Sequence, residues 1–220
     1  MHPPPSKHDT IASVDAEVAV LVSVFEQKET EDTWIQMDDA LAKFVTVVKE
    51  ASHLTGFVAA VRKLKKPILL ALNTERTRLS RTAMLLCEVL GQCLEDRFEG
   101  LSDIILPAVL KLCTRANKVI VTSANNTLKV IIDHAGVPSL ITLLSENICA
   151  PSPSKSLRIS SAECLNRILG VNTYARLEKY VEPLEAAIKN GTVDSTPEVR
   201  GLIKSTFELY KDMFPGRLDG

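Results

Sequence analysis

Aromatic residues are scarce in this sequence, and long hydrophobic runs are missing. Phe, Trp and Tyr make up 5% of the 220 residues, with a single tryptophan, whereas hydrophobic residues as a whole make up 45%. The core must therefore consist mainly of Leu, Val, Ile and Ala, which suits the apolar faces of stacked helices. No apolar run reaches the ~20 residues that a membrane-spanning helix needs, so we expect no membrane partner.

An excess of charge of one sign is also lacking. The formal net charge is −1, from 26 Lys and Arg against 27 Asp and Glu. Proteins that bind nucleic acid through their bulk charge carry a clear positive excess, so we expect no nucleic-acid partner. Any electrostatic recognition must depend on where the charges lie.

Metal-binding and catalytic motifs are missing too. The five cysteines are irregularly spaced and form no CxxC pair, which predicts buried thiols in a reducing compartment rather than disulfides or zinc ligands. No glycine-rich phosphate loop, HExxH motif or GxSxG motif occurs, and His53 and His134 lack a catalytic arrangement of partners. We therefore expect no enzymatic activity, no metal and no cofactor.

The first ten residues, MHPPPSKHDT, combine three prolines with no apolar stretch. They do not read as a signal peptide, and a proline run is stiff and does not join a helix. We expect residues 1–10 to be a disordered lead-in, residues 11–214 to be one domain and residues 215–220 to be a tail, in a cytoplasmic protein.

Apolar residues recur every three to four positions along most of the chain, and strand alternation does not occur. From Leu79, for example, the series continues through Ala83, Leu86 and Leu90, which is typical of a helix with one apolar face. The sequence predicts helices paired as 11–27 with 34–50, 54–73 with 77–94, 100–114 with 118–134, 137–147 with 155–170, and 174–190 with 197–213.

The helix pairs repeat with a regular period. The second helices begin near Leu79, Val119, Leu157 and Val199, at intervals of 40, 38 and 42 residues. A period of about 40 with a proline in the first helix is typical of HEAT repeats, whose pairs stack because one pair cannot bury its apolar face alone. We therefore predict an all-α HEAT-repeat solenoid of about five antiparallel pairs. The prolines of the first helices are Pro67, Pro107 and Pro183.

Helix boundaries are marked most clearly in the last pair. Asn190-Gly191 predicts a helix end at which glycine adopts the left-handed conformation. The run Ser195-Thr196-Pro197-Glu198 predicts a hydroxyl N-cap, a proline in the first turn and a Glu that closes a capping box.

Several segments resemble the TOG domain of the CLASP family. Asp32-Thr33-Trp34, with Asp39-Ala40-Leu41 after it, is similar to the W…AL signature that opens TOG domains. Residues 106–169 resemble the third and fourth repeats, with Asn117 to Ser123 similar to an AKIMATS-type run and Ser154 to Arg158 similar to an SKSVR-type start. Pro197 to Arg200 is similar to the SEAR-type start of the fifth repeat. The resemblance covers about residues 12–213 and marks the chain as a fungal-type or divergent relative.

This resemblance implies a fold and a partner. TOG domains are paddle-shaped HEAT arrays in which the loops within each repeat line up along one thin edge and bind tubulin. CLASP proteins use them to stabilise microtubules at the cytoskeleton and spindle, where other cytoskeletal adaptors are further partners. The family's domain has a sixth repeat and belongs to long proteins. Whether this chain is a fragment, a truncated relative or a small paralogue stays open.

Basic residues recur at the loops that lead into the second helices of the last four pairs, whereas the first pair has Trp34 at this place. Because these loops stack on one side of a solenoid, we expect a basic stripe that suits the acidic surface of tubulin. We expect the single tryptophan to anchor the contact, the alternative being that it packs beneath the first repeat. Leu79 and Val119 are expected to seat their loops. The predicted tubulin-binding residues are Trp34, Arg76, Arg78, Leu79, Lys118, Val119, Lys155, Arg158, Arg200 and Lys204.

Two other functions stay open on the sequence. The solenoid could bind a helical peptide or an adaptor on its concave face, or it could dimerise through apolar residues left bare on the last helix pair. Those same residues could instead cap the solenoid. They are Phe207, Leu209, Tyr210, Met213 and Phe214.

Overall fold

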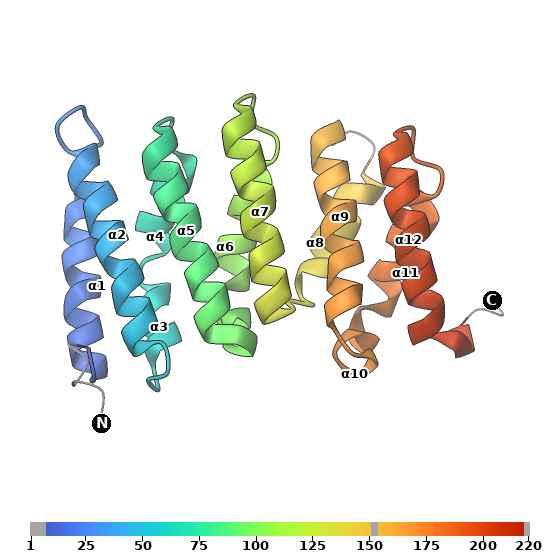
Figure 1. Cartoon of the computed structure of the whole chain (residues 1–220), viewed down its shortest axis with the longest axis horizontal. Coiled ribbons are helices and arrows are strands. Elements are labelled where there is room, and N and C mark those ends of the chain that lie inside the picture. The colour runs from blue at the N-terminus through green and yellow to red at the C-terminus, as the bar shows by residue number, and fades with distance from the viewer. Residues whose placement is uncertain (1–7, 151–153, 218–220) are drawn as a thin grey trace, which may run out of the picture.

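The computed structural model describes residues 8–150 and 154–217. Within these ranges the chain contains helices and no strand. Figure 1 shows two layers of helices, in which the second helix of each pair lies in front of the first, and the pairs follow one another along the long axis. In the described part of the chain the helices form five successive pairs, so the predicted all-α HEAT-type solenoid is confirmed.

The front layer contains the second helices of the pairs. They are α2 (Trp34–Ala51), α5 (Thr77–Leu94), α7 (Lys118–Ala135), α9 (Lys155–Val171) and α12 (Pro197–Met213). The rear layer contains α1 (Ile11–Glu26), α3 (Phe57–Arg62), α4 (Lys65–Asn73), α6 (Glu99–Leu112), α8 (Leu140–Cys149), α10 (Tyr174–Leu177) and α11 (Val181–Gly191). There are also three short 3-10 helices in the described chain: η1 (Glu95–Phe98), η2 (Glu178–Tyr180) and η3 (Pro215–Arg217).

Two rear helices are interrupted where continuous helices were predicted. The segment predicted at 54–73 divides into α3 and α4, and the one at 174–190 divides into α10, η2 and α11. Pro67 and Pro183 are each the third residue after the interruption. A proline has no N–H to donate, so it fits the first turn of a helix but not the middle of a longer one.

A single aliphatic core lies between the two layers. Leu41, Leu72, Leu90 and Leu128 are all fully buried, and they come from four different helices. Burial of each such side chain stabilises the fold by about 1.5–3 kcal/mol, so each pair depends on its neighbour. The largest fully buried side chains include Phe44, Phe57 and Phe98.

Helix starts are fixed by polar caps on three helices. The hydroxyl of Thr10 accepts from the Ser13 N–H at 3.2 Å. The amide oxygen of Asn117 accepts from the Val119 N–H at 3.0 Å, and the hydroxyl of Ser154 accepts from the Leu157 N–H at 3.2 Å. These bonds satisfy N–H groups that a helix cannot pair internally.

The boundary of the last pair differs from its prediction. Pro197 is the first residue of α12, as predicted, but Thr196 makes no side-chain capping bond. Its backbone N–H donates to Asp194 Oδ1 at 2.7 Å instead. The predicted capping box is therefore wrong, because the carboxylate of Asp194, and not that of Glu198, accepts from the Thr196 N–H.

Gly191 does not adopt a left-handed conformation, contrary to the prediction; in the described chain the positive-φ glycines are Gly56 and Gly136. Gly191 is the last residue of α11. A Cβ there would lie 2.5 Å from Ile203 Cγ1, so the glycine is needed for the close approach of α12.

Parts of the expected lead-in and tail belong to the helical array. His8 is buried and Thr10 caps α1, while residues 1–7 lie outside the described chain. At the other end Arg217, in η3, contacts Glu185 at 2.6 Å. Residues 151–153, in the break predicted between α8 and α9, lie outside the described chain as well.

The aromatic residues of α12 close the C-terminal end of the solenoid. Tyr210 and Phe214 are buried, at 3% and 2% exposure, and their rings stack at 5.0 Å. The Tyr210 hydroxyl donates to Glu185 Oε1 at 2.5 Å. Phe207 is 36% exposed. Two of the five residues proposed for a bare dimerisation patch are therefore capping residues.

Candidate protein-binding edge

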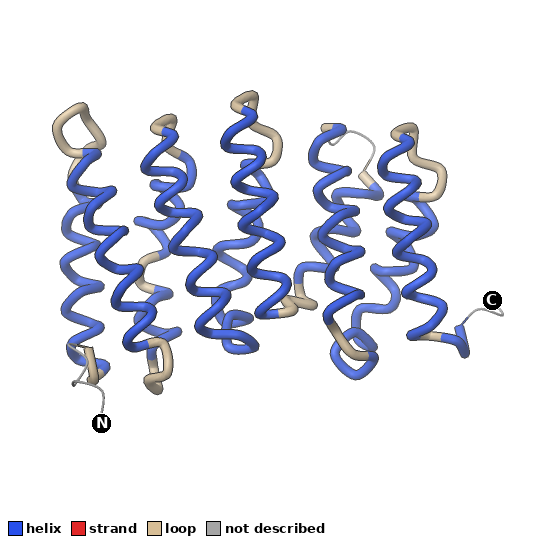
Figure 2. Tube along the Cα trace, in the orientation of Figure 1, coloured by secondary structure: helices blue, strands red, loops and turns tan. Residues whose placement is uncertain are grey.

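The loops within the repeats lie together along one edge. Figures 1 and 2 show the α1–α2, α4–α5, α6–α7 and α11–α12 connections at the top of the molecule, where α9 also begins. All five front helices begin at this edge, so their N-termini face it and add partial positive charge. The predicted alignment of these loops is confirmed. We refer to this row of loops, with the first two turns of the front helices, as the loop edge.

Trp34 opens α2 at the loop edge and is half-buried against the core. The Arg76 guanidinium lies 5.2 Å from the ring centroid, and that of Arg78 lies 5.8 Å from it. Cations over an indole face each contribute about 0.5–1 kcal/mol at an exposed site. Trp34 therefore both packs on the first repeat and remains partly accessible at the edge.

The cations beside Trp34 are paired with acidic residues of the first repeat. Arg76 Nη2 lies 2.8 Å from Glu31 Oε1, and this contact holds the pKa of the Glu31 carboxyl below its usual value. Arg78 Nε lies 2.6 Å from the buried Asp38 carboxylate. These contacts join the α4–α5 loop to the first repeat.

Arg115 and Arg158 connect repeats in the same manner. Arg115 contacts Glu75 and donates to the Asn73 carbonyl at 2.8 Å. Arg158 Nε lies 2.8 Å from Asp194 Oδ2, with side-chain exposures of 16% and 7%. Burial acts to raise the pKa of Asp194, but hydrogen bonds from the Thr196 N–H and from Arg158 prevail and lower it.

The edge is therefore not an uninterrupted basic stripe. Lys155 Nζ lies 3.0 Å from Glu198, and Arg200 donates to the Asp194 carbonyl at 2.7 Å. Lys118 and Lys204 are exposed and make no ion pair within residues 8–150 and 154–217. Much of the predicted charge binds neighbouring repeats, and the cations left over lie in the centre and towards the C-terminal end.

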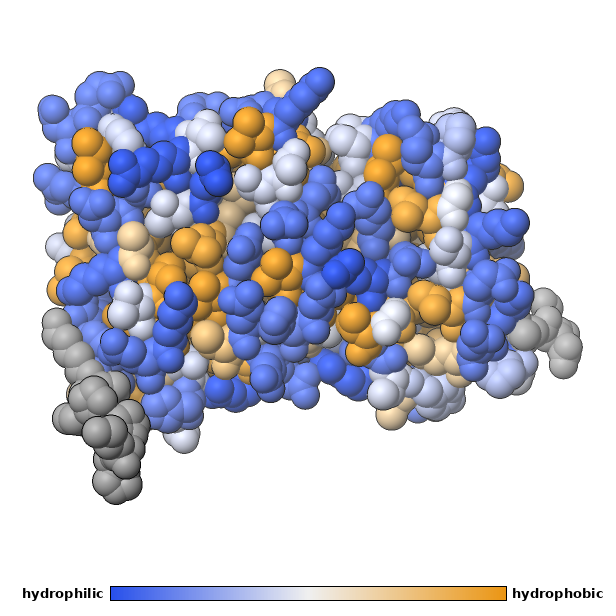
Figure 3. All heavy atoms as spheres, viewed as in Figure 1, coloured by the Kyte–Doolittle hydropathy of each residue, from blue (hydrophilic) through white to orange (hydrophobic). Residues whose placement is uncertain are grey.

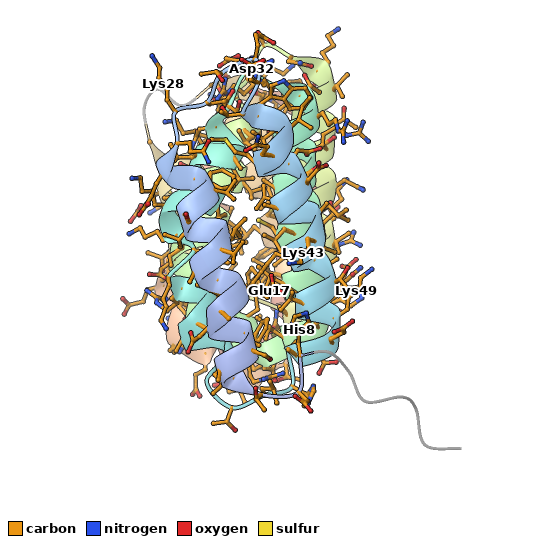
Figure 4. The ribbon with its side chains drawn as sticks, turned by 90° about the vertical axis from the view of Figure 1, so that its left-hand side faces the viewer. His8, Glu17, Lys28, Asp32, Lys43 and Lys49 are labelled. Carbon is orange, nitrogen blue, oxygen red and sulfur yellow. The ribbon has the colours of Figure 1, made fainter. Side chains whose placement is uncertain are left out.

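The N-terminal end of the edge is acidic. Figure 4 shows Lys28 and Asp32 at the tip of the first loop. Away from the edge, in the middle of the same end of the solenoid, Lys43 faces Glu17, and 2.7 Å separates the two charged groups. Glu31 belongs to the same loop, and its side chain is 84% exposed. The charge of the edge thus changes from acidic at the first loop to basic at the third.

Leu79 has to be removed from the predicted contact residues. It is 0% exposed and lies in the core, so it can seat its loop but cannot contact a partner. Val119, in contrast, is 52% exposed at the start of α7. The other expected contact residues are exposed or half-buried along the edge: Trp34, Arg76, Arg78, Lys118, Lys155, Arg158, Arg200 and Lys204.

Two exposed apolar residues at the edge were not predicted. Ile35 is 46% exposed beside Trp34, and Val193 is 80% exposed in the α11–α12 loop. Their signal in the sequence is a branched apolar residue within a polar loop. Figure 3 shows hydrophobic atoms interspersed among hydrophilic ones on the front face, including a group at the top of α7.

Metal ligands and reactive thiols do not gather anywhere in the described chain. No group of three or more His, Cys, Asp or Glu side chains within it could hold a metal ion. Burial raises the pKa of the Cys87 thiol to about 12 and that of Cys113 to about 11. Cys149 is exposed and Cys93 is half-buried, which corrects the expectation that all five thiols are buried. The helices of residues 8–150 and 154–217 include none with the length and hydropathy of a membrane span.

Comparison with known proteins identifies similar sequences along nearly the whole chain. A family model described as "CLASP N terminal" matches residues 14–219. Protein peg1 of Schizosaccharomyces pombe is 25% identical over 209 residues, covering 92% of this chain and 14% of that protein. Protein stu-1 of Neurospora crassa is 24% identical over 204 residues, covering 88% of this chain and 18% of that protein.

A vertebrate protein is similar as well. CLIP-associating protein 1-B of Xenopus laevis is 28% identical over 168 residues, covering 76% of this chain and 11% of that protein. The chain therefore spans less than a fifth of the length of each of these relatives.

Proposed function

Because the chain belongs to the CLASP N-terminal family, we propose that it is a microtubule-associated domain that binds tubulin along the loop edge. This function makes it a binding module without catalysis, acting at microtubules and the spindle in the cytoplasm. Other cytoskeletal adaptors would bind elsewhere on the solenoid or through other parts of a longer protein.

This proposal depends mainly on one observation: a lysine that is unpaired in the described chain, Lys118, and an exposed valine, Val119, lie next to each other at the centre of the edge. Lys118 has no carboxylate within 4.0 Å in the described chain, and Val119 beside it is 52% exposed. A free cation next to an exposed apolar side chain is suited to an acidic protein surface, because charge steers the encounter and apolar burial adds affinity.

A hollow beside this centre offers room for a partner's apolar side chain. It has a volume of about 300 Å³ and lies between the α4–α5 and α6–α7 loops. Its lining is mixed: Leu72, Leu112 and Ile120 are apolar, and the ion pair of Arg115 with Glu75 is part of it. Side chains that dominate binding tend to fill such depressions near the centre of an interface.

The ends of the edge supply weaker, distributed contacts. At the first repeat, Trp34 and Ile35 present apolar surface, and Arg78 keeps 65% of its side chain exposed while paired. At the last repeats, Lys155, Arg200 and Lys204 remain accessible. Rim charges of this kind mainly raise association rates rather than affinity.

Co-elution of the purified chain with tubulin at low salt tests the proposal. We expect a complex with the wild type and its loss with the double variant Lys118→Glu, Val119→Ser, because the variant removes the cation and the exposed apolar side chain at the centre of the edge. The variant should remain folded, since both side chains are exposed. The matched control is Arg97→Glu, which reverses an exposed arginine in η1 at the opposite edge. A double variant that co-elutes as well as the wild type would rule out the loop edge as the tubulin site.

A further inference from the structure

The front face carries a second surface feature, a groove between α5 and α7. Its volume is about 650 Å³, and it runs down the face from the start of α5. Arg78, Arg81, Leu85 and Glu88 line it from α5, and Ser123 and Asn126 line it from α7. Its start, with Arg78 and Arg81 in the first two turns of α5, overlaps the loop edge, and from there it continues along the front face past Leu85.

The two helices beside the groove, α5 and α7, are joined differently from the other pairs of adjacent front helices. Arg78 bonds Asp38 between α5 and α2, Arg167 bonds Asp133 between α9 and α7, and Lys155 bonds Glu198 between α9 and α12. Between α5 and α7, the described residues form no ion pair. The side chains are joined there by a hydrogen bond of 2.7 Å from Thr127 to Glu88 and a longer one between Asn117 and Thr77.

Arg81 is the cation that this arrangement leaves over. It is exposed, and no carboxylate lies within 4.0 Å of it among the described residues. Ser123 and Asn126, on the opposite wall, use no side-chain hydrogen bond in the same part of the chain. Within the described chain, the start of the groove therefore offers an unpaired positive charge and free polar groups for a ligand, while its other end carries the Glu88 carboxylate, which accepts from Thr127.

Leu85 adds apolar surface one turn below Arg81. It is 47% exposed, although it lies on a helix whose other leucines are buried. Figure 3 shows a group of hydrophobic atoms over the middle of α5 on this face. A ligand that covers Leu85 would gain about 25 cal/mol for each Å² of apolar surface removed from water.

We propose that this groove binds an extended peptide segment of a partner protein that is acidic and partly apolar. A ligand carboxylate pairs with Arg81, with Arg78 above it adding positive potential, and an apolar side chain next to the carboxylate covers Leu85. Ser123 and Asn126 bond the peptide's backbone. The cations at the start of the groove select an acidic residue there, because a basic one would bring like charges together. Glu88, at the other end, disfavours a second acidic residue beyond Leu85.

An array of short synthetic peptides tests the proposal with the full chain as the probe. One set combines Glu or Asp with Leu, Ile or Phe in all orders, and the control set replaces each acid by Lys. We expect the acidic set to bind and the basic set not to bind. The tightest peptide, measured in solution, should bind Arg81→Glu and Leu85→Ser about tenfold more weakly than the wild type.

One control variant and one test of folding accompany this experiment. Arg97→Glu should bind the peptide as the wild type does, and circular dichroism should show that the groove variants remain folded, since Arg81 and Leu85 are both exposed. Equal binding by Arg81→Glu, or no preference for the acidic set, would overturn the proposal. Loss of the peptide in Lys118→Glu with retention in Arg81→Glu would overturn it too, while leaving the proposed tubulin edge intact.

Discussion

At the scale of single residues, the cations of the loop edge divide between two tasks. Arg76, Arg115 and Arg158 bond acids of adjoining repeats, whereas Lys118 faces solvent without an acid in the described chain. The first group orders the loops and the second is available to a partner. A stability measurement and a binding measurement should therefore separate them.

The ion pair of Arg158 with Asp194 is expected to matter most for stability. Both side chains are largely buried, so Arg158→Ala leaves a carboxylate without its partner and should lower the free energy of unfolding by about 2–3 kcal/mol. Lys155→Ala, which breaks a pair with exposures of 61% and 54%, should cost less than about 1 kcal/mol. Urea unfolding of both variants measures the difference, and equal losses would contradict this assignment.

The same pair predicts a dependence on pH. Hydrogen bonds hold the pKa of Asp194 below its ordinary value of 3.8 in the folded chain. Its contribution to stability is then complete above pH 3.8 and is lost as the pH falls through the lower, folded-state pKa. The stability difference between the wild type and Asp194→Asn should therefore shrink below that pH. A difference that is constant from pH 7 down to about pH 2 would show that this carboxylate's charge is not what stabilises the loop.

Trp34→Ala should separate packing from recognition. The indole is half-buried, so its loss should destabilise the domain by about 1–2 kcal/mol and leave it folded. If Trp34 contacts tubulin, the affinity should fall about tenfold or more. Calorimetric melting and tubulin binding of the same preparation measure both effects. Unchanged affinity would reduce Trp34 to a residue that packs the first repeat.

Residue identity alone predicted which side chains would come to the edge, but not their partners. Arg158 and Lys118 read alike in the sequence as cations near the start of a second helix. Their difference depends on Asp194, 36 positions from Arg158 along the chain, and on how α12 stacks against α9. The burial of Leu79 likewise follows from the rotation of α5 about its axis, which a loop-proximity argument cannot give.

At the scale of helices, close approach is set by small residues. A Cβ on Gly191 would meet Ile203 Cγ1 at 2.5 Å, whereas one on Gly201, in α12, would meet nothing within 4 Å. We expect Gly191→Ala to destabilise the domain by about 1–3 kcal/mol through overpacking. Gly201→Ala should stabilise it by about 0.4–1 kcal/mol by restricting the unfolded chain. Thermal unfolding measures both, and two changes of the same sign would be inconsistent with this packing.

Most helices could be predicted from the sequence, because apolar spacing of 3–4 residues follows directly from burial of one face. The predicted 34–50 and 77–94 helices correspond to Trp34–Ala51 and Thr77–Leu94. The interruptions before Pro67 and Pro183 were missed, because a proline in a helical pattern fits either a kink or a new first turn. Only packing against α5 or α12 selects between them.

At the scale of the whole molecule, net charge conceals the separation of charge along the edge. The formal net charge is −1, yet the first loop is acidic and the third carries an unpaired lysine in the described chain. Association with an acidic partner should therefore slow as salt rises. The Debye length falls from about 30 Å at 0.01 M to about 8 Å at 0.15 M ionic strength. Stopped-flow association with tubulin measures the slope, and Lys118→Gln should flatten it more than Arg97→Gln.

Hydrogen–deuterium exchange of the chain with and without tubulin tests the central claim most directly. If the loop edge binds tubulin, the amides of residues 74–78, 113–120 and 192–200 should exchange more slowly in the complex, because all belong to one edge. Residues 95–99 and 173–180, at the opposite edge, should be unaffected. Protection confined to the opposite edge, or to the front face alone, would contradict tubulin binding by the loops.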